Sequence, residues 1–389
     1  MHPSLTAQFQ PPPELEPRIQ MPPYDPCWCG SGKKWKWCHQ NREQQKPVPI
    51  GKLLAEQRAE MVRGYCLHPS ASPETCSPKI IRAHTVQRQG GLAAIAEDGH
   101  VISPKLGFED IFRNDGKIVP RLHGVRDTST FMGFCGIHDD ALFAPIEKGS
   151  FTLDSEAAFL LSFRAICYEL YTKDASLRFV EIQRELDRGA PLEIQCAIQQ
   201  DLHFYREGIK RGLSDLETWK GQYDQAYRTG DLGNFSFAGV LFADTLPLVA
   251  CGAFYPEFGF DGKRLQIITR GEYIFEHVCF NLTVVAGKSV AVLGWTGAPD
   301  GPSELFCISF QGLPKDVMAN AVFHLACEQL ENTYFRPSWW NIQTDAAREH
   351  LIQRFRSGIG FDGTERRPDC LSRFEYLFST AAVAQELVS

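Results

Sequence analysis

The sequence predicts an α+β fold built from several domains, and three observations lead to this prediction. Cysteine and histidine gather in two regions before residue 140, as expected of small metal-stabilised modules. Apolar residues then recur every three or four positions between residues 151 and 229, which is the spacing of amphipathic helices. From residue 235 onward, short apolar runs separated by turn-forming residues predict a mostly antiparallel sheet with flanking helices.

Length and composition narrow the class of protein. With 389 residues, of which 43% are hydrophobic and 12% aromatic, the chain can form two or three domains with hydrophobic cores. The net charge of −7 argues against a general polyanion binder, so any contact with DNA or RNA should be local. There is no basic start followed by an apolar run, and no apolar run long enough to span a membrane, so we expect a cytoplasmic protein. An odd number of cysteines, 13, indicates metal ligands and free thiols rather than disulfides.

Three cysteines and one histidine lie close together between Cys27 and His39. Three thiolates and one imidazole complete a tetrahedral Zn²⁺ site without an open position, which is typical of a structural ion. Gly30 and Gly32 allow the chain to turn sharply between the two ligand pairs. Because so short a segment cannot bury enough apolar surface to fold alone, metal binding would supply most of its folding free energy. The alternative is a metal-free cluster of reduced cysteines.

The same segment resembles the SEC-C motif, a small zinc module known from the C-terminus of the SecA translocation motor and from the ends of many bacterial proteins. The likeness lies in the Cys-x-Cys pair, the Gly-Ser-Gly-Lys-Lys turn and the adjacent Cys-His pair, and it covers residues 24–40. It implies docking to a protein or ribosomal partner. The interleaved lysines and tryptophans could instead bind nucleic acid by charge and stacking. The zinc ligands implied by the resemblance are Cys27, Cys29, Cys38 and His39.

A second group of cysteines and histidines flanks a strand-like apolar run that ends at His84. This order resembles the HNH or His-Me finger nucleases of the treble-clef kind, in which two zinc knuckles flank a histidine on a strand. The resemblance implies that His84 is the general base that activates water and that Asp139 binds a divalent metal, Mg²⁺ or Mn²⁺, next to a phosphate. It implies a second Zn²⁺ site with the ligands Cys66, Cys76, Cys135 and His138.

The second group also departs from that family. The first knuckle is Cys-x9-Cys with His68 as a possible substitute ligand, no clear asparagine precedes Cys135, and the gap from His84 to Cys135 is long. A purely architectural zinc site, with a structural histidine at position 84, therefore stays an alternative. Other side chains that could complete a site, pair with phosphate or simply be solvated charges are His123, Asp127, Arg82, Arg121, Arg126, Asp140 and Glu147.

The expected domains follow from these patterns. Two apolar stripes, separated by Gly189-Ala190-Pro191, predict an antiparallel helical hairpin. Two later helices are expected at residues 315–332 and 342–357, and strands at 235–242, 246–255, 264–268, 277–285, 289–295 and 305–310. The predicted domains are a disordered Pro-rich tail at 1–23, the SEC-C-like module at 24–45, a linker helix at 46–62, the treble-clef-like zinc region at 63–150, the hairpin at 151–229 and an α+β domain of unknown role at 230–389.

Two functions of different class are consistent with these predictions. In the first, both zinc sites are structural, and the chain is a non-enzymatic adaptor that docks through residues 28–37. In the second, the chain is a metal-dependent HNH-like nuclease, which could serve in defence against foreign DNA. The sequence contains no HExxH or GxSxG motif, so the common signatures of zinc proteases and serine hydrolases are absent.

Overall fold

The computed structural model describes residues 13–104, 114, 117–147, 152–268, 274–359 and 378–388. The fold is α+β, as predicted. The described residues form two compact units: unit 1 contains residues 13–63 and Leu170–Glu217, and unit 2 contains the others. Residues 1–12 of the predicted tail lie outside the described residues. In the rest of that tail, the Leu15 backbone N–H donates a hydrogen bond to Gln200 Oε1 at 2.8 Å.

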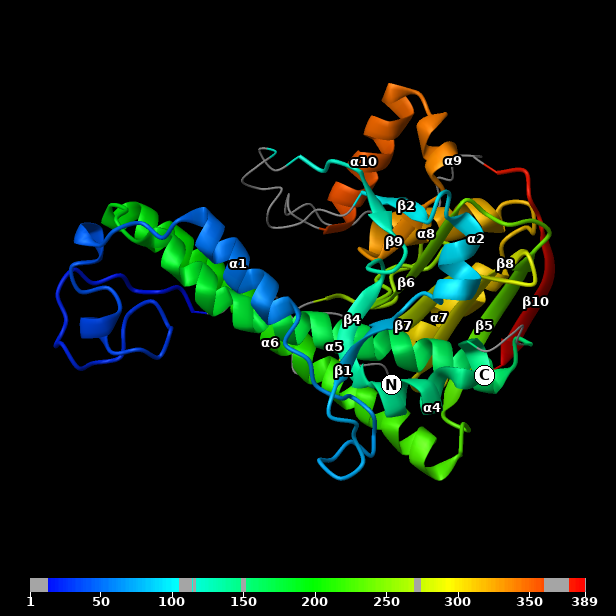
Figure 1. Cartoon of the computed structure of the whole chain (residues 1–389), viewed down its shortest axis with the longest axis horizontal. Coiled ribbons are helices and arrows are strands. Elements are labelled where there is room, and N and C mark those ends of the chain that lie inside the picture. Colours follow the sequence, from blue (N-terminus) through cyan, green and yellow to red (C-terminus); the bar gives the residue numbers. More distant parts are fainter. Residues whose placement is uncertain are drawn as a thin grey trace. The chain divides into compact units, whose positions relative to one another are not determined.

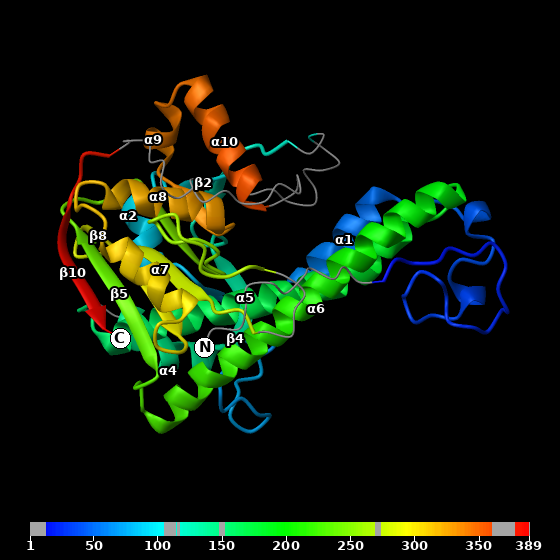
Figure 2. The same cartoon turned by 180° about the vertical axis from the view of Figure 1, so that it is seen from behind.

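The predicted helical hairpin is formed by α5 (Ser155–Gln183) and α6 (Leu192–Thr229). Because each helix contributes residues to both units, the units divide the chain differently from the domains expected from the sequence. The predicted linker helix is α1 (Ile50–Met61), which lies along α6 in both views of the chain (Figures 1 and 2). Within unit 1, α1 is fixed to α5 by a hydrogen bond from Arg178 Nε to Glu60 Oε2 at 2.7 Å.

Unit 2 contains an eight-stranded sheet in the order β10-β5-β8-β7-β6-β9-β2-β3. Each pairing of its neighbours is antiparallel. Figure 1 shows β10 at one edge, beside β5. The strands are β2 (His100–Ser103), β3 (Arg121–Gly124), β5 (Phe235–Phe242), β6 (Leu248–Phe254), β7 (Val278–Val285), β8 (Lys288–Thr296), β9 (Thr333–Phe335) and β10 (Ala382–Val388).

Helices pack against this sheet around one apolar core. Phe306, Phe310 and Phe323 are fully buried there among the strands' alanine, valine and leucine side chains. The helices are α7 (Pro302–Gln311), α8 (Met318–Gln329), α9 (Pro337–Asn341) and α10 (Asp345–Ile359). None of the described helices combines the length and the apolar character that a membrane crossing requires.

Two of the expected strands are wrong. Residues 305–310 lie in α7, which starts at Pro302, a residue well suited to the first turn of a helix. The run has helical spacing, because Phe306 and Phe310 are buried while Leu305 and Ile308 are exposed. Residues 264–268 form no strand and contribute only an isolated bridge between Phe258 and Arg264.

A second, two-stranded sheet in unit 2 joins β1 (Ile80–His84) and β4 (Thr130–Cys135) antiparallel, with His84 opposite Thr130. The chain continues from β4 directly into α4 (Gly136–Glu147). Between β1 and β4 lie a π-helical turn, α2 (Ala93–Ile95), and β2 and β3, which belong to the large sheet. This insertion accounts for the long gap between His84 and Cys135.

Candidate metal centres and an adjoining cleft

The first Cys/His group of unit 1 is buried and its ligand atoms are close together. One atom from each of Cys27, Cys29, Cys38 and His39 lies within 4.8 Å of the others. Cys29 Sγ and Cys38 Sγ are 3.6 Å apart, and Cys27 Sγ is 3.2 Å from His39 Nδ1. Ligands at the usual Zn–S and Zn–N distances on a tetrahedron are about 3.5–3.8 Å apart. The group could therefore hold a metal ion and is compatible with zinc binding.

Asp187 completes the surroundings of His39, and no sequence pattern predicted it. His39 Nε2 lies 2.8 Å from Asp187 Oδ2, so Nδ1 is the ring nitrogen that faces the three sulfurs. Histidines that bind metals usually donate their other N–H to a carboxylate or carbonyl. Asp187 lies 148 residues further along the chain, in the turn of the hairpin, where nothing in the local sequence marks it.

The second group, in unit 2, is formed by Cys66, Cys76, Cys135 and His138, whose ligand atoms also lie within 4.8 Å of one another. His138 Nδ1 is 3.4 Å from Cys66 Sγ, 3.5 Å from Cys76 Sγ and 3.4 Å from Cys135 Sγ. Backbone hydrogen bonds from residues 65 and 67 to β4 hold the first cysteine beside the strand. This group, too, is compatible with zinc binding.

His68 does not belong to the second group. Its ring stacks on His138 with a centroid distance of 4.0 Å and an interplanar angle of 2°. Its Nδ1 accepts the Ser70 backbone N–H at 3.1 Å, and its Nε2 lies 3.3 Å from the Tyr227 hydroxyl. Both nitrogens therefore have other partners, and the substitute ligand considered from the sequence is not needed.

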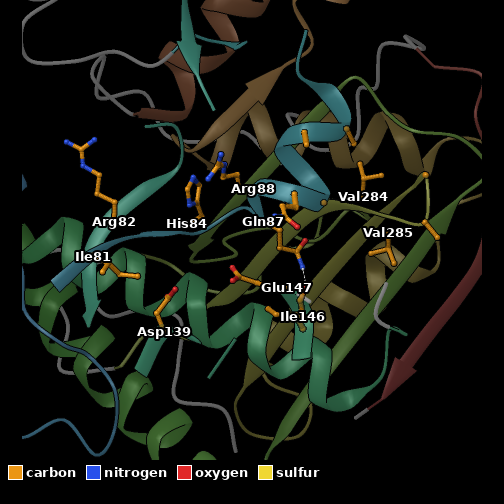
Figure 3. Close-up of a pocket in the computed structure, with 16 residues that line it drawn as sticks. Ile81, Arg82, His84, Gln87, Arg88, Asp139, Ile146, Glu147, Val284 and Val285 are labelled. Atoms are coloured by element: carbon orange, nitrogen blue, oxygen red, sulfur yellow. Dashed lines mark hydrogen bonds between the residues drawn. The ribbon is translucent and has the colours of Figure 1, made fainter. Parts of the chain in front are cut away.

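An open cleft of about 860 Å³ in unit 2 brings His84 and Asp139 together. Figure 3 shows Asp139 and Glu147, both on α4, pointing toward the space beneath His84 and Arg88. His84 Nε2 lies 3.1 Å from the Val125 carbonyl oxygen. This carbonyl can only accept, so Nε2 carries the proton and Nδ1 keeps its lone pair. Burial lowers the pKa of His84, so that the ring is neutral at pH 7.

The two carboxylates of the cleft have different surroundings. Burial raises the pKa of Asp139 to about 6, and its Oδ1 has no hydrogen-bond partner among the described residues. Glu147 Oε1 accepts a hydrogen bond at 2.8 Å from Arg164, whose side chain on α5 is completely buried and stacks on Phe143. The sequence pattern marks Glu147 only as one of several possible solvated charges, and it does not mark Arg164 at all.

The other side chains considered from the sequence are placed as follows. Arg82 lines the cleft but pairs with Asp127. Arg88, which no sequence pattern marks, lies in the cleft on the π-helical turn. Five other candidates are not among the described residues that line the cleft: His123, Asp127, Arg121, Arg126 and Asp140.

Comparison with known proteins identifies the N-terminal module. Residues 25–41 match the SEC-C motif. The chain therefore carries a SEC-C motif. Methionine aminopeptidase from Chlamydia trachomatis serovar D is 42% identical over 38 residues, which is 10% of this chain and 13% of that protein. No solved structure matches the chain. The resemblance of residues 63–147 to HNH proteins stays a prediction.

Proposed function

We propose that this chain is a zinc-binding protein whose unit 2 hydrolyses phosphodiester bonds in nucleic acid. The observation that supports this most directly is that His84 and Asp139 line one open cleft, with the imidazole held through Nε2 by the Val125 carbonyl. In this tautomer the Nδ1 lone pair can accept a proton from water, which is the task of a general base. The two Cys/His groups would each bind one structural Zn²⁺.

The proposed hydrolysis needs few groups. His84 Nδ1 removes a proton from water while the water oxygen attacks phosphorus. The bond from phosphorus to the leaving sugar oxygen breaks, and that oxygen takes a proton from solvent. Arg88 at the side of the cleft can pair with a phosphate oxygen. Asp139 would hold a divalent cation, Mg²⁺ or Mn²⁺, which would supply charge neutralisation at the phosphate.

The cleft suits such a cation only in part. Among the described residues, His84, Asp139 and Glu147 do not form a group with ligand atoms within 4.8 Å of one another. However, Mg²⁺ keeps several waters and is commonly held by one or two carboxylates together with the substrate's phosphates. Asp139, with an oxygen that has no hydrogen-bond partner in the described structure, can supply one such carboxylate.

Nicking of supercoiled plasmid in the presence of Mg²⁺ or Mn²⁺ tests the nuclease. We expect His84→Ala to lower the rate by at least about 100-fold, because general-base catalysis typically contributes that much. The control is His100→Ala, since His100 is an exposed histidine on β2 that does not line the cleft. No cleavage by the wild-type chain, or equal cleavage by His84→Ala, would refute the proposal.

A second function, docking through the SEC-C motif, is favoured by one exposed face of the module. Tyr24 and Trp37 are 60% and 64% exposed, and their rings meet edge to face at 6.5 Å. Lys34 Nζ lies 5.3 Å from the Tyr24 ring and 5.4 Å from the Trp37 ring, and Lys36 Nζ lies 5.3 Å from Tyr24. Trp28 and Trp35 are buried, so the face is narrower than the sequence suggested.

Co-sedimentation with ribosomes, or pulldown of a protein partner, tests docking. We expect Trp37→Ala combined with Lys34→Ala to abolish the interaction while zinc stays bound, because both side chains are exposed whereas the cysteines are buried. Ile342→Ala is the control, since Ile342 is 77% exposed and belongs to unit 2. Binding that is unchanged in the double variant would exclude this face.

A further inference from the structure

The SEC-C module is fastened to the turn of the helical hairpin by buried hydrogen bonds, all within unit 1. Asp187 is at their centre: Oδ2 lies 2.8 Å from His39 Nε2 and accepts from Gln199 Nε2 at 2.8 Å. Its Oδ1 accepts from Arg42 Nε at 2.7 Å. Asp187 and Gln199 are completely buried, so these bonds do not compete with water.

Arg184 makes a second link in the same place. Its Nη1 donates to the Cys29 backbone carbonyl at 2.9 Å and to Gln199 Oε1 at 2.7 Å. The Arg184 carbonyl in turn accepts from Arg42 Nη2 at 2.8 Å. The hairpin turn therefore touches two of the four candidate zinc ligands, His39 through its ring and Cys29 through its backbone.

We infer that Asp187 is a positioning residue for the first zinc centre, and that the SEC-C module and the hairpin turn fold as one metal-dependent unit. This inference rests on the proposed binding of Zn²⁺ by the module. A histidine that binds through Nδ1 must carry its proton on Nε2, and Asp187 accepts that proton's hydrogen bond. The carboxylate thereby fixes both the tautomer and the orientation of the ring.

The charges of the cluster agree with this role. A Zn²⁺ ion with three thiolates leaves one net negative charge, and Asp187 adds a second. Arg42 and Arg184, both 3% exposed, supply two positive charges beside them. Buried charges are tolerated when they are paired and hydrogen-bonded. Arg42 and Arg184 are further paired with Glu185 at 3.4 Å and Glu181 at 3.2 Å.

Zinc affinity of Asp187 variants tests the inference. Competition with a chromophoric chelator should show that Asp187→Ala binds Zn²⁺ about 10–100-fold more weakly, as expected when the carboxylate behind a metal-binding histidine is lost. Asp187→Asn, which keeps an acceptor of the same size, should lie between this variant and wild type. If Asp187→Ala does not fold, the zinc affinity of Asp187→Asn is compared with that of the wild type instead. The matched control is Glu185→Gln, because Glu185 lies in the same turn and reaches Arg42 but no ligand.

Two further readouts separate positioning from general stability. The Co²⁺-substituted full-length chain should show a changed absorption spectrum in Asp187→Asn, because the ring orientation of His39 changes even when the site is loaded. Removal of zinc from the wild type should speed hydrogen exchange of the amides at residues 184–199, and in Asp187→Ala chelation should change them little. The inference would be overturned if Asp187→Ala and Glu185→Gln bound zinc with equal affinity. It would also be overturned if removing zinc from the wild type left the exchange rates of the hairpin amides unchanged. A wild-type chain without zinc would also remove the proposed zinc centre.

Discussion

Replacing Glu147 by glutamine should destabilise unit 2 more than replacing its partner Arg164 by methionine. The Arg164 side chain is 1% exposed, whereas that of Glu147 is 34% exposed. In Glu147→Gln, the guanidinium stays buried without its counter-charge. Such a loss costs about 3–5 kcal/mol, and we expect about 3 kcal/mol because glutamine can still accept one hydrogen bond.

The opposite substitution should be milder. In Arg164→Met the remaining carboxylate can be hydrated, and ion pairs with an exposed partner are worth about 1 kcal/mol or less. The methionine sulfur can also replace part of the contact between Arg164 and the Phe143 ring, which lies 3.9 Å from the guanidinium carbon. The double variant should be more stable than Glu147→Gln alone, because it holds no uncompensated charge.

Alkylation of Cys167 under native conditions measures this difference. Cys167 is fully buried on α5, one turn from Arg164, so its thiol reacts only when this region opens. Mass spectrometry of the peptide follows one site, which avoids treating two units as a single two-state transition. A difference of about 2 kcal/mol predicts roughly 30-fold faster labelling in Glu147→Gln than in Arg164→Met. Equal rates, or faster labelling in Arg164→Met, would refute the reasoning.

Elemental analysis should find two Zn²⁺ per chain in the wild type and one in Cys76→Ser. The control Cys327→Ser should keep two, because this thiol is buried in the core of unit 2. An unchanged zinc count in Cys76→Ser would contradict the prediction. Burial lowers the pKa of His277 from its ordinary 6.5 to about 3. Between pH 6.5 and pH 3, His277 is therefore protonated in the unfolded chain but neutral in the folded chain. Stability against urea should therefore fall as the pH drops from 6.5 toward 3, and less steeply in His277→Phe; parallel curves would count against this. Gly189→Ala should lower the melting temperature of unit 1, because φ is +78° and the new Cβ would lie 2.8 Å from the Gln45 carbonyl oxygen. The strain alone is about 1–2 kcal/mol. Gly208→Ala, in open space on α6, should be neutral or stabilising, and equal effects of the two substitutions would be evidence against the strain.

Much of the fold is predictable because the responsible patterns are local. The spacing of apolar residues over a short segment is enough to predict which side chains are buried. This holds for the helices α5 and α6 and for the strands β5 to β8. Cysteine and histidine at short spacings likewise indicate metal ligands, because the ligand types and their separation are visible in the sequence itself. Short apolar runs are harder to assign. Over six residues, the apolar pattern of a helix such as α7 is hardly different from that of a buried strand.

The partners of these groups could not be predicted in the same way. Asp187 and Arg164 act through single contacts with residues far away or on another helix, and nothing beside them in the sequence distinguishes them from solvated charges. The pairing of β2 with β9 depends on tertiary register, which a short strand does not encode by itself. His84 and Asp139 share a cleft only because β1 and α4 pack against each other.

The position of the insertion between β1 and β4 sets an order in which the two metal centres can form during synthesis. The four candidate ligands of the first centre have all been made once His39 is synthesised, whereas Asp187 follows 148 residues later. The second must wait for His138 and close a much longer loop, at a greater cost in chain entropy. Of the strands within that loop, β2 pairs with β9, which is made about 200 residues after the second centre's last ligand. In the order of synthesis, the candidate ligands of the second centre are therefore complete before Asp187, so the first centre has all four ligands early but its positioning residue last.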